Sequence, residues 1–271
     1  MSSRPETANY AGSEGMNMKW RLIVYGLLGM ALAIVLSTQY TVDRPDTEMV
    51  VIVNPRNPLN PVVRNPYQEE YEQMLYPTIR ITAGYSTGSG VIIPLSPPLS
   101  KGETGGFYIL TAAHVVENES TVTVEIYSDT GCTIQDAIVV ITDTTKDLAL
   151  LSFSEGISFT ATLAPRNYTP YIFTPVYTVG CSLGLQPRPS QGIISVIGKD
   201  NWEVTSPILP GNSGGPVFDA RTFEVIGIAV WVKVYNGQLI TTMAGVVPVS
   251  EIYEFLEQTP DGSLATGCAR K

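Results

Sequence analysis

The chain has 271 residues, of which 44% are hydrophobic and 15% charged, so it can bury a full core and is not a disordered protein. Its formal charge at pH 7 is −9, whereas surfaces that follow nucleic-acid phosphates need clustered lysine and arginine. We therefore expect a globular protein with no nucleic-acid partner.

The metal-binding residue types are scarce. One histidine and three scattered cysteines cannot supply the closely spaced ligands of a zinc site. Cys132, Cys181 and Cys268 form no CxxC pair, and their odd number argues against a disulfide framework as the source of stability. We expect no metal and no cofactor.

Residues 22–40 form an apolar segment close to the length of about 20 residues that crosses a bilayer. Lys19 and Arg21 precede it, so the positive-inside rule places residues 1–21 in the cytoplasm and the rest of the chain outside. This predicts a signal anchor embedded in the lipid bilayer. A cleaved signal peptide is the alternative, but the nearest small-x-small pattern, Ala31–Ala33, lies inside the apolar run. A buried core helix is disfavoured because the segment has no polar face.

The rest of the chain changes character twice. Residues 41–66 are rich in proline, which favours an extended linker, and a short helix is expected over Tyr67–Tyr76. Residues 67–258 then form a globular domain that ends in a helix over Val249–Glu257, before a tail at 259–271. Within the domain, short runs of β-branched and aromatic residues predict strands at 78–82, 90–93, 107–111, 122–127, 137–141, 148–153, 193–197, 216–218 and 224–232. Many short strands with little helix predict a barrel or a sandwich.

His114 is the only imidazole in the chain, and therefore the only side chain whose ordinary pKa suits proton transfer near neutral pH. It follows a predicted strand in the string LTAAHVV, where Ala112 and Ala113 are small enough to let the backbone turn. A lone histidine is more often structural, so a catalytic role requires partners.

Ser213 is a candidate partner, because glycines flank it in PGNSGGPVF and allow a tight turn that exposes its hydroxyl. Such a turn can also aim the N–H groups of Gly211 and Ser213 into one pocket, as an oxyanion hole requires. A glycine-rich hairpin is the simpler alternative. The string also fits the G-x-S-x-G elbow of α/β-hydrolases, but that fold places its histidine after the serine, and His114 comes before.

A third partner would be a carboxylate that orients the imidazole. Asp147 begins the apolar strand LALLSF, whereas the competing Asp143 lies in a threonine-rich, solvated turn. An Asp-His-Ser order would have to use Asp43 or Asp46, which lie next to the membrane segment, and a Cys-His order is excluded because every cysteine follows His114. The order His, Asp, Ser is the one that remains.

These strings together resemble a known family. GSGVII, LTAAHVV, DLALL, GIIS, PGNSGGPVF and VIGIAV occur in the order found in trypsin-like serine proteases, and the chain is most similar to their HtrA/Deg branch over Thr78–Glu257. The resemblance implies an all-β fold, a chymotrypsin-like double β-barrel with a C-terminal helix. It also implies that His114 is the general base, Asp147 its orienting partner and Ser213 the nucleophile, with Gly211 and Ser213 forming the oxyanion hole.

The same resemblance assigns the substrate pocket to two segments. One comprises Pro207, Ile208 and Leu209, and the other Ile228, Ala229 and Val230. Enzymes of this class that cut after lysine or arginine carry an acidic residue where this chain has Pro207, so basic side chains should be rejected. A shift of one or two residues in the alignment would bring Ser206 or Glu203 nearer to the pocket.

Three features depart from the HtrA pattern. No PDZ domain is expected after the final helix, and the loop over residues 93–106 has no role that we can assign. Cys181 stands where polar or small residues are common in the family, and a buried, inert thiol is expected there.

The sequence thus predicts a membrane-anchored serine endopeptidase that cleaves protein or peptide substrates through an acyl-enzyme, outside the cytoplasm, in protein quality control or processing. A catalytically silent, peptide-binding or structural member of the same fold is the alternative. A homo-oligomer is left open.

Overall fold

The computed structural model describes residues 51–52, 62–63, 65–95, 106–154 and 159–258. The chain divides into two units, residues 1–63 and 64–271. In the first unit, the short strands β1 (Val51–Ile52) and β2 (Val62–Val63) pair in antiparallel fashion. None of the helices in these described ranges is long and apolar enough to span a membrane. Three predicted segments lie outside the described residues. They are the anchor at 22–40, most of the 93–106 loop (residues 96–105) and the tail at 259–271.

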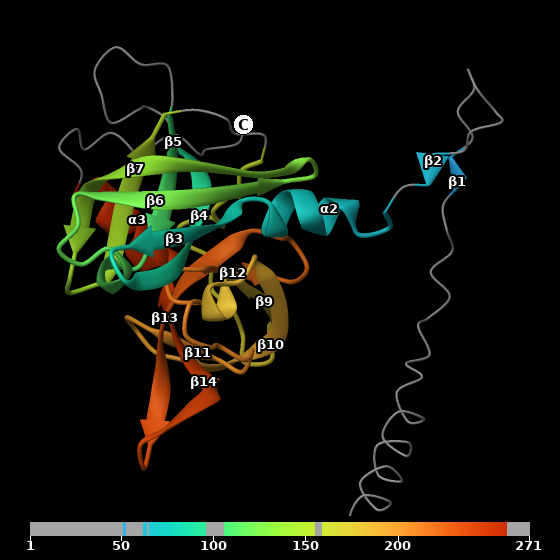
Figure 1. Ribbon diagram of the computed structural model, residues 1–271. Helices are drawn as coiled ribbons and strands as arrows, with labels where there is room; N and C mark the ends of the chain where they lie inside the picture. The colour runs from blue at the N-terminus through green and yellow to red at the C-terminus, as the bar shows by residue number, and fades with distance from the viewer. Residues whose placement is uncertain (1–50, 53–61, 64, 96–105, 155–158, 259–271) are drawn as a thin grey trace, which may run out of the picture. The chain divides into compact units, whose positions relative to one another are not determined.

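The second unit contains two closed six-stranded β-barrels (Figure 1). The first barrel consists of β3 (Thr78–Ala83), β4 (Ser86–Leu95), β5 (Gly106–Thr111), β6 (Thr121–Ser128), β7 (Gly131–Asp143) and β8 (Leu148–Phe153). The second consists of β9 (Pro175–Gly180), β10 (Arg188–Ile197), β11 (Trp202–Val204), β12 (Pro216–Asp219), β13 (Val225–Tyr235) and β14 (Gln238–Pro248).

Both barrels have the same strand order. It is β3-β4-β5-β8-β7-β6 in the first barrel and β9-β10-β11-β14-β13-β12 in the second, and every pairing is antiparallel. Closure of each barrel removes the open sheet edges that would otherwise pair with another chain. The expected all-β double barrel with a C-terminal helix is confirmed.

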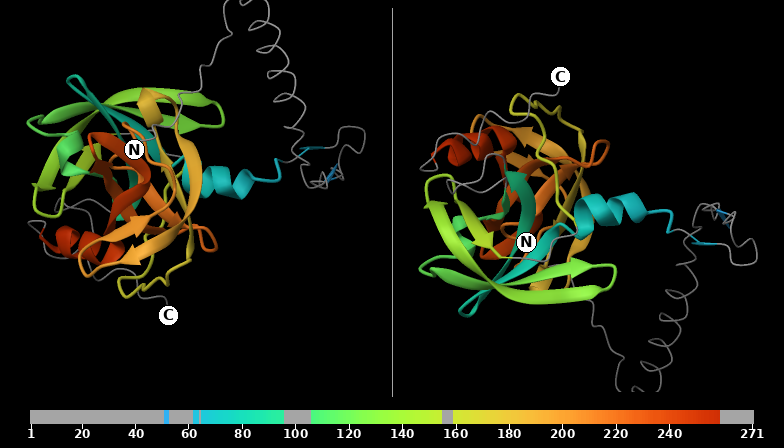
Figure 2. Two further views of the ribbon diagram at one scale, coloured as in Figure 1. Left: turned by 90° about the horizontal axis from the view of Figure 1, so that it is seen from below. Right: turned by 90° about the horizontal axis from the view of Figure 1, so that it is seen from above.

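The two longest helical segments that the structure describes lie at the ends of the domain. The predicted helix over Tyr67–Tyr76 is present as α2 (Gln68–Glu70) and the π-helical turn η1 (Tyr71–Leu75). The final helix, α3, spans Val249–Glu257 as expected. It packs on β13 and β14 and lies beside the first barrel (Figure 2).

Three strands of the two barrels were missed from the sequence, namely β9, β11 and β14. The sequence of β14, QLITTMAGVVP, has no alternation of apolar and polar residues, and a Cβ at Gly245 would collide with the indole of Trp231 on the paired strand β13. Beyond this contact, β13 and β14 continue as a long hairpin that projects from the second barrel in Figure 1. A strand whose glycine makes room for a neighbouring ring has no alternating signature of its own.

The core fixes the two barrels to each other. One cluster of buried apolar side chains extends from Leu110 and Leu150 in the first barrel to Val179 and Phe218 in the second. All four are fully buried. Because interiors are close-packed, the residues at the junction of the barrels are held in fixed positions.

Candidate active site

His114 lies at the junction, just after β5. It belongs to the 3-10 turn η2 (Ala113–Val115), and its side chain is 43% exposed. Ala112 and Ala113 before it are buried, as the string LTAAHVV predicted, so the chain turns where no large side chain obstructs it. The imidazole is therefore presented at the end of a strand.

Asp147 contacts His114 at two points. Its Oδ2 lies 2.7 Å from Nδ1 of the ring, and its Oδ1 accepts a hydrogen bond of 3.0 Å from the His114 N–H. The backbone of Asp147 is left-handed, with φ of +54°, a conformation that aspartate tolerates better than most residues. An ionised carboxylate can only accept, so Nδ1 carries the proton and Nε2 is left as the basic nitrogen.

The hydrogen bond from the imidazole to Asp147 raises the pKa of His114 above 6.5, against the opposing effect of burial and with help from the charges of Asp147 and Glu117. A raised folded-state pKa means that the pair stabilises the fold below pH 6.5, and this contribution is lost as the pH rises through the folded-state pKa. The contact with Asp147 thus stabilises the imidazolium more than water does.

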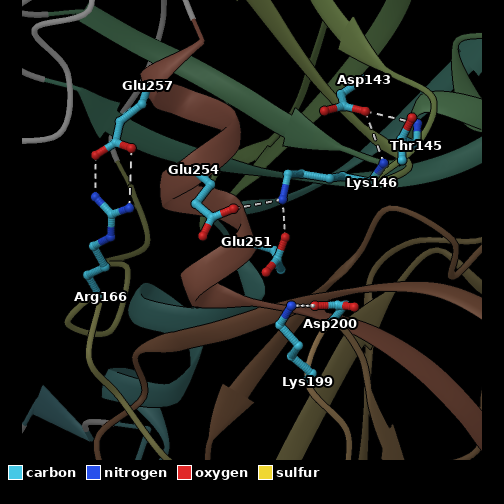
Figure 3. Close-up of polar contacts among 9 residues, drawn as sticks. All are labelled: Asp143, Thr145, Lys146, Arg166, Lys199, Asp200, Glu251, Glu254 and Glu257. Atoms are coloured by element: carbon cyan, nitrogen blue, oxygen red, sulfur yellow. Dashed lines mark hydrogen bonds and ion pairs between the residues drawn. The ribbon is translucent and has the colours of Figure 1, made fainter.

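Asp143, the competing carboxylate, has a different task (Figure 3). Its Oδ1 accepts hydrogen bonds from the N–H groups of Thr145, at 2.9 Å, and Lys146, at 3.0 Å. It therefore caps the turn that leads into Asp147. The structure brings Asp147, and not Asp143, into contact with His114.

Ion pairs hold α3 against this turn and against the segment between the barrels. Lys146 pairs with Glu251 and, at 3.0 Å, with Glu254, while Arg166 pairs with Glu257 (Figure 3). The Lys146 side chain is only 19% exposed, so these ion pairs are largely shielded from water. The residue next to Asp147 is thus tied to the final helix.

Ser213 lies in a turn whose glycines adopt conformations that other residues avoid. Gly211 has φ of +97° and Gly214 has φ of +82°. The N–H of Gly214 donates to the carbonyl of Ala229 at 2.7 Å, and the N–H of Ala229 donates to the carbonyl of Gly215 at 2.9 Å. Strand β13 therefore holds the turn in place, and the two glycines adopt the positive φ values that a tight turn requires.

Two N–H groups of this turn are free. The N–H groups of Asn212, Gly214 and Gly215 donate to backbone carbonyls, but those of Gly211 and Ser213 donate to no group in the part of the chain that the structure describes. An anion placed at this turn would find both as donors.

The serine turn also packs against the strand that carries the histidine. A Cβ at Gly214 would lie 2.9 Å from the N atom of Ala112 and would collide with Thr111 Oγ1. Among the described contacts, no hydrogen bond joins Ser213 to His114. Catalytic hydrogen bonds are often long or poorly aligned before substrate binds.

The expected substrate-pocket residues are not alike in exposure. Ile208, Ile228 and Ala229 are buried in the core, whereas Pro207 is exposed and Leu209 is 38% exposed. The first three can contribute to a pocket mainly through their backbone and by shaping its wall. Of the two possible alternatives, the hydroxyl of Ser206 is engaged with Thr178 Oγ1 at 2.6 Å.

Val230 lines a cavity of about 520 Å³ together with Trp231, Val247 and Asp147. Trp231 was not singled out from the sequence, although it directly follows Val230 in the strand. Its exposure of 38% and its place beside Asp147 are features of the folded chain, and no sequence pattern singles it out.

The remaining chemistry is limited. Cys181 is fully buried, and this burial raises its pKa to about 12, as expected for an inert thiol. Within the described ranges, no group of three histidine, cysteine, aspartate or glutamate side chains could hold a metal ion.

Paired barrels with a His-Asp contact and a glycine-flanked serine at their junction define the class of chymotrypsin-like proteins. The family model "Trypsin-like peptidase domain" matches residues 88–228. The chain belongs to the trypsin-like peptidase family.

The curated relatives are proteases of the HtrA and DegP type. "Serine protease Do-like HtrA" of Bacillus subtilis is 32% identical over 158 residues, covering 52% of this chain and 32% of the relative. "Probable periplasmic serine endoprotease DegP-like" of Pseudomonas fluorescens is 30% identical over 173 residues, covering 61% of this chain and 32% of the relative. The chain thus spans about a third of the length of these relatives.

Solved structures share the fold. The serine endoprotease from Yersinia pestis superposes with a TM-score of 0.59 at 24% identity, covering 73% of this chain and 67% of that one. The HtrA-type protease AlgW with a tripeptide superposes with a TM-score of 0.60 at 23% identity, covering 73% of this chain and 65% of that one.

Because the chain has one histidine, its ring protons give a single NMR signal set in which the pKa of His114 can be followed. We expect a pKa above 6.5 that falls in Asp147→Asn, since the amide removes the negative charge and replaces one of the two acceptor oxygens with an NH2 donor. Asp143→Asn is the matched control, because Asn keeps the Oδ1 acceptor that caps the turn. An equal fall in both variants would contradict the assignment of Asp147.

Proposed function

We propose that this protein is a serine endopeptidase in which Ser213 is the nucleophile, His114 the general base and Asp147 the residue that orients the imidazole. The two-point contact between Asp147 and His114 carries the proposal. It fixes the ring so that Nε2 is the basic nitrogen, which is the arrangement that deprotonation of a serine requires. The free N–H groups of Gly211 and Ser213 supply the matching oxyanion hole.

In this mechanism, Ser213 Oγ adds to the carbonyl carbon of the scissile peptide bond while its proton passes to Nε2 of His114. The carbonyl oxygen becomes an oxyanion held by the N–H groups of Gly211 and Ser213. The C–N bond then breaks, and His114 gives its proton to the leaving amine. Water repeats the sequence on the acyl-enzyme, releasing the acid and restoring Ser213. Asp147 stabilises the imidazolium throughout and keeps its own negative charge.

A silent member of the fold that only binds peptides is the rival. It would need no basic nitrogen and no pair of free N–H donors, and the chain has residues suited to both tasks. These features favour an enzyme over a binding module.

A fluorophosphonate probe should label folded protein at Ser213, and Ser213→Ala should abolish the labelling. His114→Ala should reduce turnover of a peptide substrate by about 10³-fold or more, and the double variant should lose little more, because triad members act as a unit. Ser154→Ala, at an exposed serine, is the control and should label normally. Absence of label from folded wild-type protein, or independent additive losses, would count against the proposal.

The primary pocket should reject basic side chains. Pro207 stands where a carboxylate would be needed, and an unpaired cation in an apolar pocket costs several kcal/mol, on the order of 3. Two peptides that differ only in lysine or norleucine at the cleaved position separate charge from size. The norleucine peptide should show at least tenfold higher kcat/KM, and a library should show broad cleavage after Val, Ala, Leu or Ile. Dominant cleavage after Lys or Arg would overturn this assignment.

Residues 22–40 anchor the protein in the membrane in this proposal, with the protease domain outside the cytoplasm acting in quality control or processing. The charge asymmetry at Lys19 and Arg21 supports this orientation. The full-length chain should sediment with membranes and resist alkaline extraction, whereas a variant lacking residues 1–63 should stay soluble. Protease added outside spheroplasts should reach the domain. A soluble form cut near Thr38 would instead identify a signal peptide.

A further inference from the structure

The serine turn is held from outside at four successive residues. The carbonyl of Pro210 accepts from the Leu183 N–H at 2.7 Å, and Asn212 Oδ1 accepts from the Ser182 hydroxyl at 2.6 Å. The carbonyls of the other two residues, Gly211 and Ser213, both accept hydrogen bonds from Ser89.

Ser89, in β4 of the first barrel, reaches this turn with its backbone and with its side chain. Its N–H donates to the Ser213 carbonyl at 2.8 Å, and its hydroxyl donates to the Gly211 carbonyl at 2.6 Å. The same hydroxyl accepts from the Cys181 N–H at 2.8 Å, and the Ser89 carbonyl accepts from Thr111 Oγ1 at 2.6 Å. Ser89 is fully buried, so none of these bonds is exchanged for water.

The Ser89 hydroxyl binds the Gly211–Asn212 peptide, which lies between the two N–H groups proposed to form the oxyanion hole. The N–H of Gly211 belongs to the planar Pro210–Gly211 peptide, and the N–H of Ser213 belongs to the Asn212–Ser213 peptide. The first plane is fixed by the bond to Leu183, and the second by the bond from the Gly215 N–H to the Asn212 carbonyl, at 2.9 Å. Between them lies the Gly211–Asn212 peptide, whose carbonyl is bound by Ser89 Oγ.

One other bond restrains the Gly211–Asn212 peptide, because the Asn212 N–H donates to the Leu209 carbonyl at 3.0 Å. Gly211 itself has φ of +97° and no side chain to limit rotation, and a Cβ there would collide with the Cys181 carbonyl. Rotation of the middle peptide would change the backbone angles that join the two flanking planes, and with them the directions of the two N–H groups. A misplacement of about 1 Å in such a site can cost about 100-fold in rate.

We propose that the hydroxyl of Ser89 is a positioning element for the oxyanion hole, which couples the first barrel to the Cys181–Gly184 turn of the second and keeps the Gly211 and Ser213 N–H groups convergent. This inference rests on the proposed function of Ser213. Ser89 touches no reacting atom; it acts through the peptide that it holds.

Ser89→Ala in the full-length chain removes the hydroxyl and keeps the backbone bond to Ser213. We expect kcat for a peptide substrate to fall at least tenfold with KM nearly unchanged. Affinity for a peptide boronate, whose oxygen occupies the oxyanion hole, should fall by the same factor, while affinity for a non-covalent product peptide should not change. Thr78→Val is the matched control, because it removes another fully buried hydroxyl of the first barrel, which donates to the Met74 carbonyl at 2.7 Å. It should destabilise the fold without lowering kcat.

Amide hydrogen exchange of residues 211–215 and of Cys181 supplies a readout that needs no activity. Exchange there should be faster in Ser89→Ala than in Thr78→Val, even in a protein whose Ser213 the fluorophosphonate does not label. Missing label in the wild type therefore refutes the protease proposal, whereas unchanged exchange refutes the role of Ser89.

If Ser89→Ala fails to fold, Ser89→Cys is measured instead. Because the thiol is a weak donor, the affinity of this variant for the boronate should fall by at most about tenfold. Equal losses in kcat, boronate affinity and product-peptide affinity would reduce Ser89 to a structural residue and overturn the inference.

Discussion

The shape of the serine turn depends on hydrogen bonds that come from both barrels. Two of its residues, Gly211 and Gly214, have positive φ, so local preference alone does not select this conformation. Ser89 of the first barrel and Ala229 of the second bind its backbone from two sides. The turn can therefore form only when the barrels are closed and packed together, which makes the candidate site a consequence of the whole fold.

The histidine side of the site is built in a different way. His114 and Asp147 belong to one barrel and adjoin its paired strands β5 and β8, so their contact follows from the register of those strands. The turn before Asp147 is closed locally by Asp143 and tied to α3 through Lys146. The proposed base and its orienting aspartate are thus set by the first barrel, whereas the proposed nucleophile is carried by the second, and packing at the junction determines their alignment.

Residue type and chain order were enough to predict much of this arrangement. A single histidine, a serine in the glycine-rich string PGNSGGPVF and an aspartate opening an apolar strand pointed to His114, Ser213 and Asp147. The roles of Ser89 and Trp231 could not be found in that way. Ser89 lies between two glycines in the string GSGVII, but the string does not show its partners Cys181 and Gly211, which are more than 90 positions away and which only the closed fold brings near. The strand β14 was missed for a related reason. Gly245 makes room for the ring of Trp231 on the neighbouring strand, and the sequence of β14 alone does not show this contact.

The side chain of Asn212 supports the serine turn without carrying a charge. Asn212 is 2% exposed, and a carboxylate buried to this degree would require a cation beside it. An amide oxygen needs only a hydrogen-bond donor, and the Ser182 hydroxyl supplies one at 2.6 Å. A neutral pair of this kind forms at any pH at which the fold is stable. The serine turn is therefore held by neutral groups, namely backbone groups, hydroxyls and one amide. The geometry of the turn depends on packing and not on the ionisation of a partner.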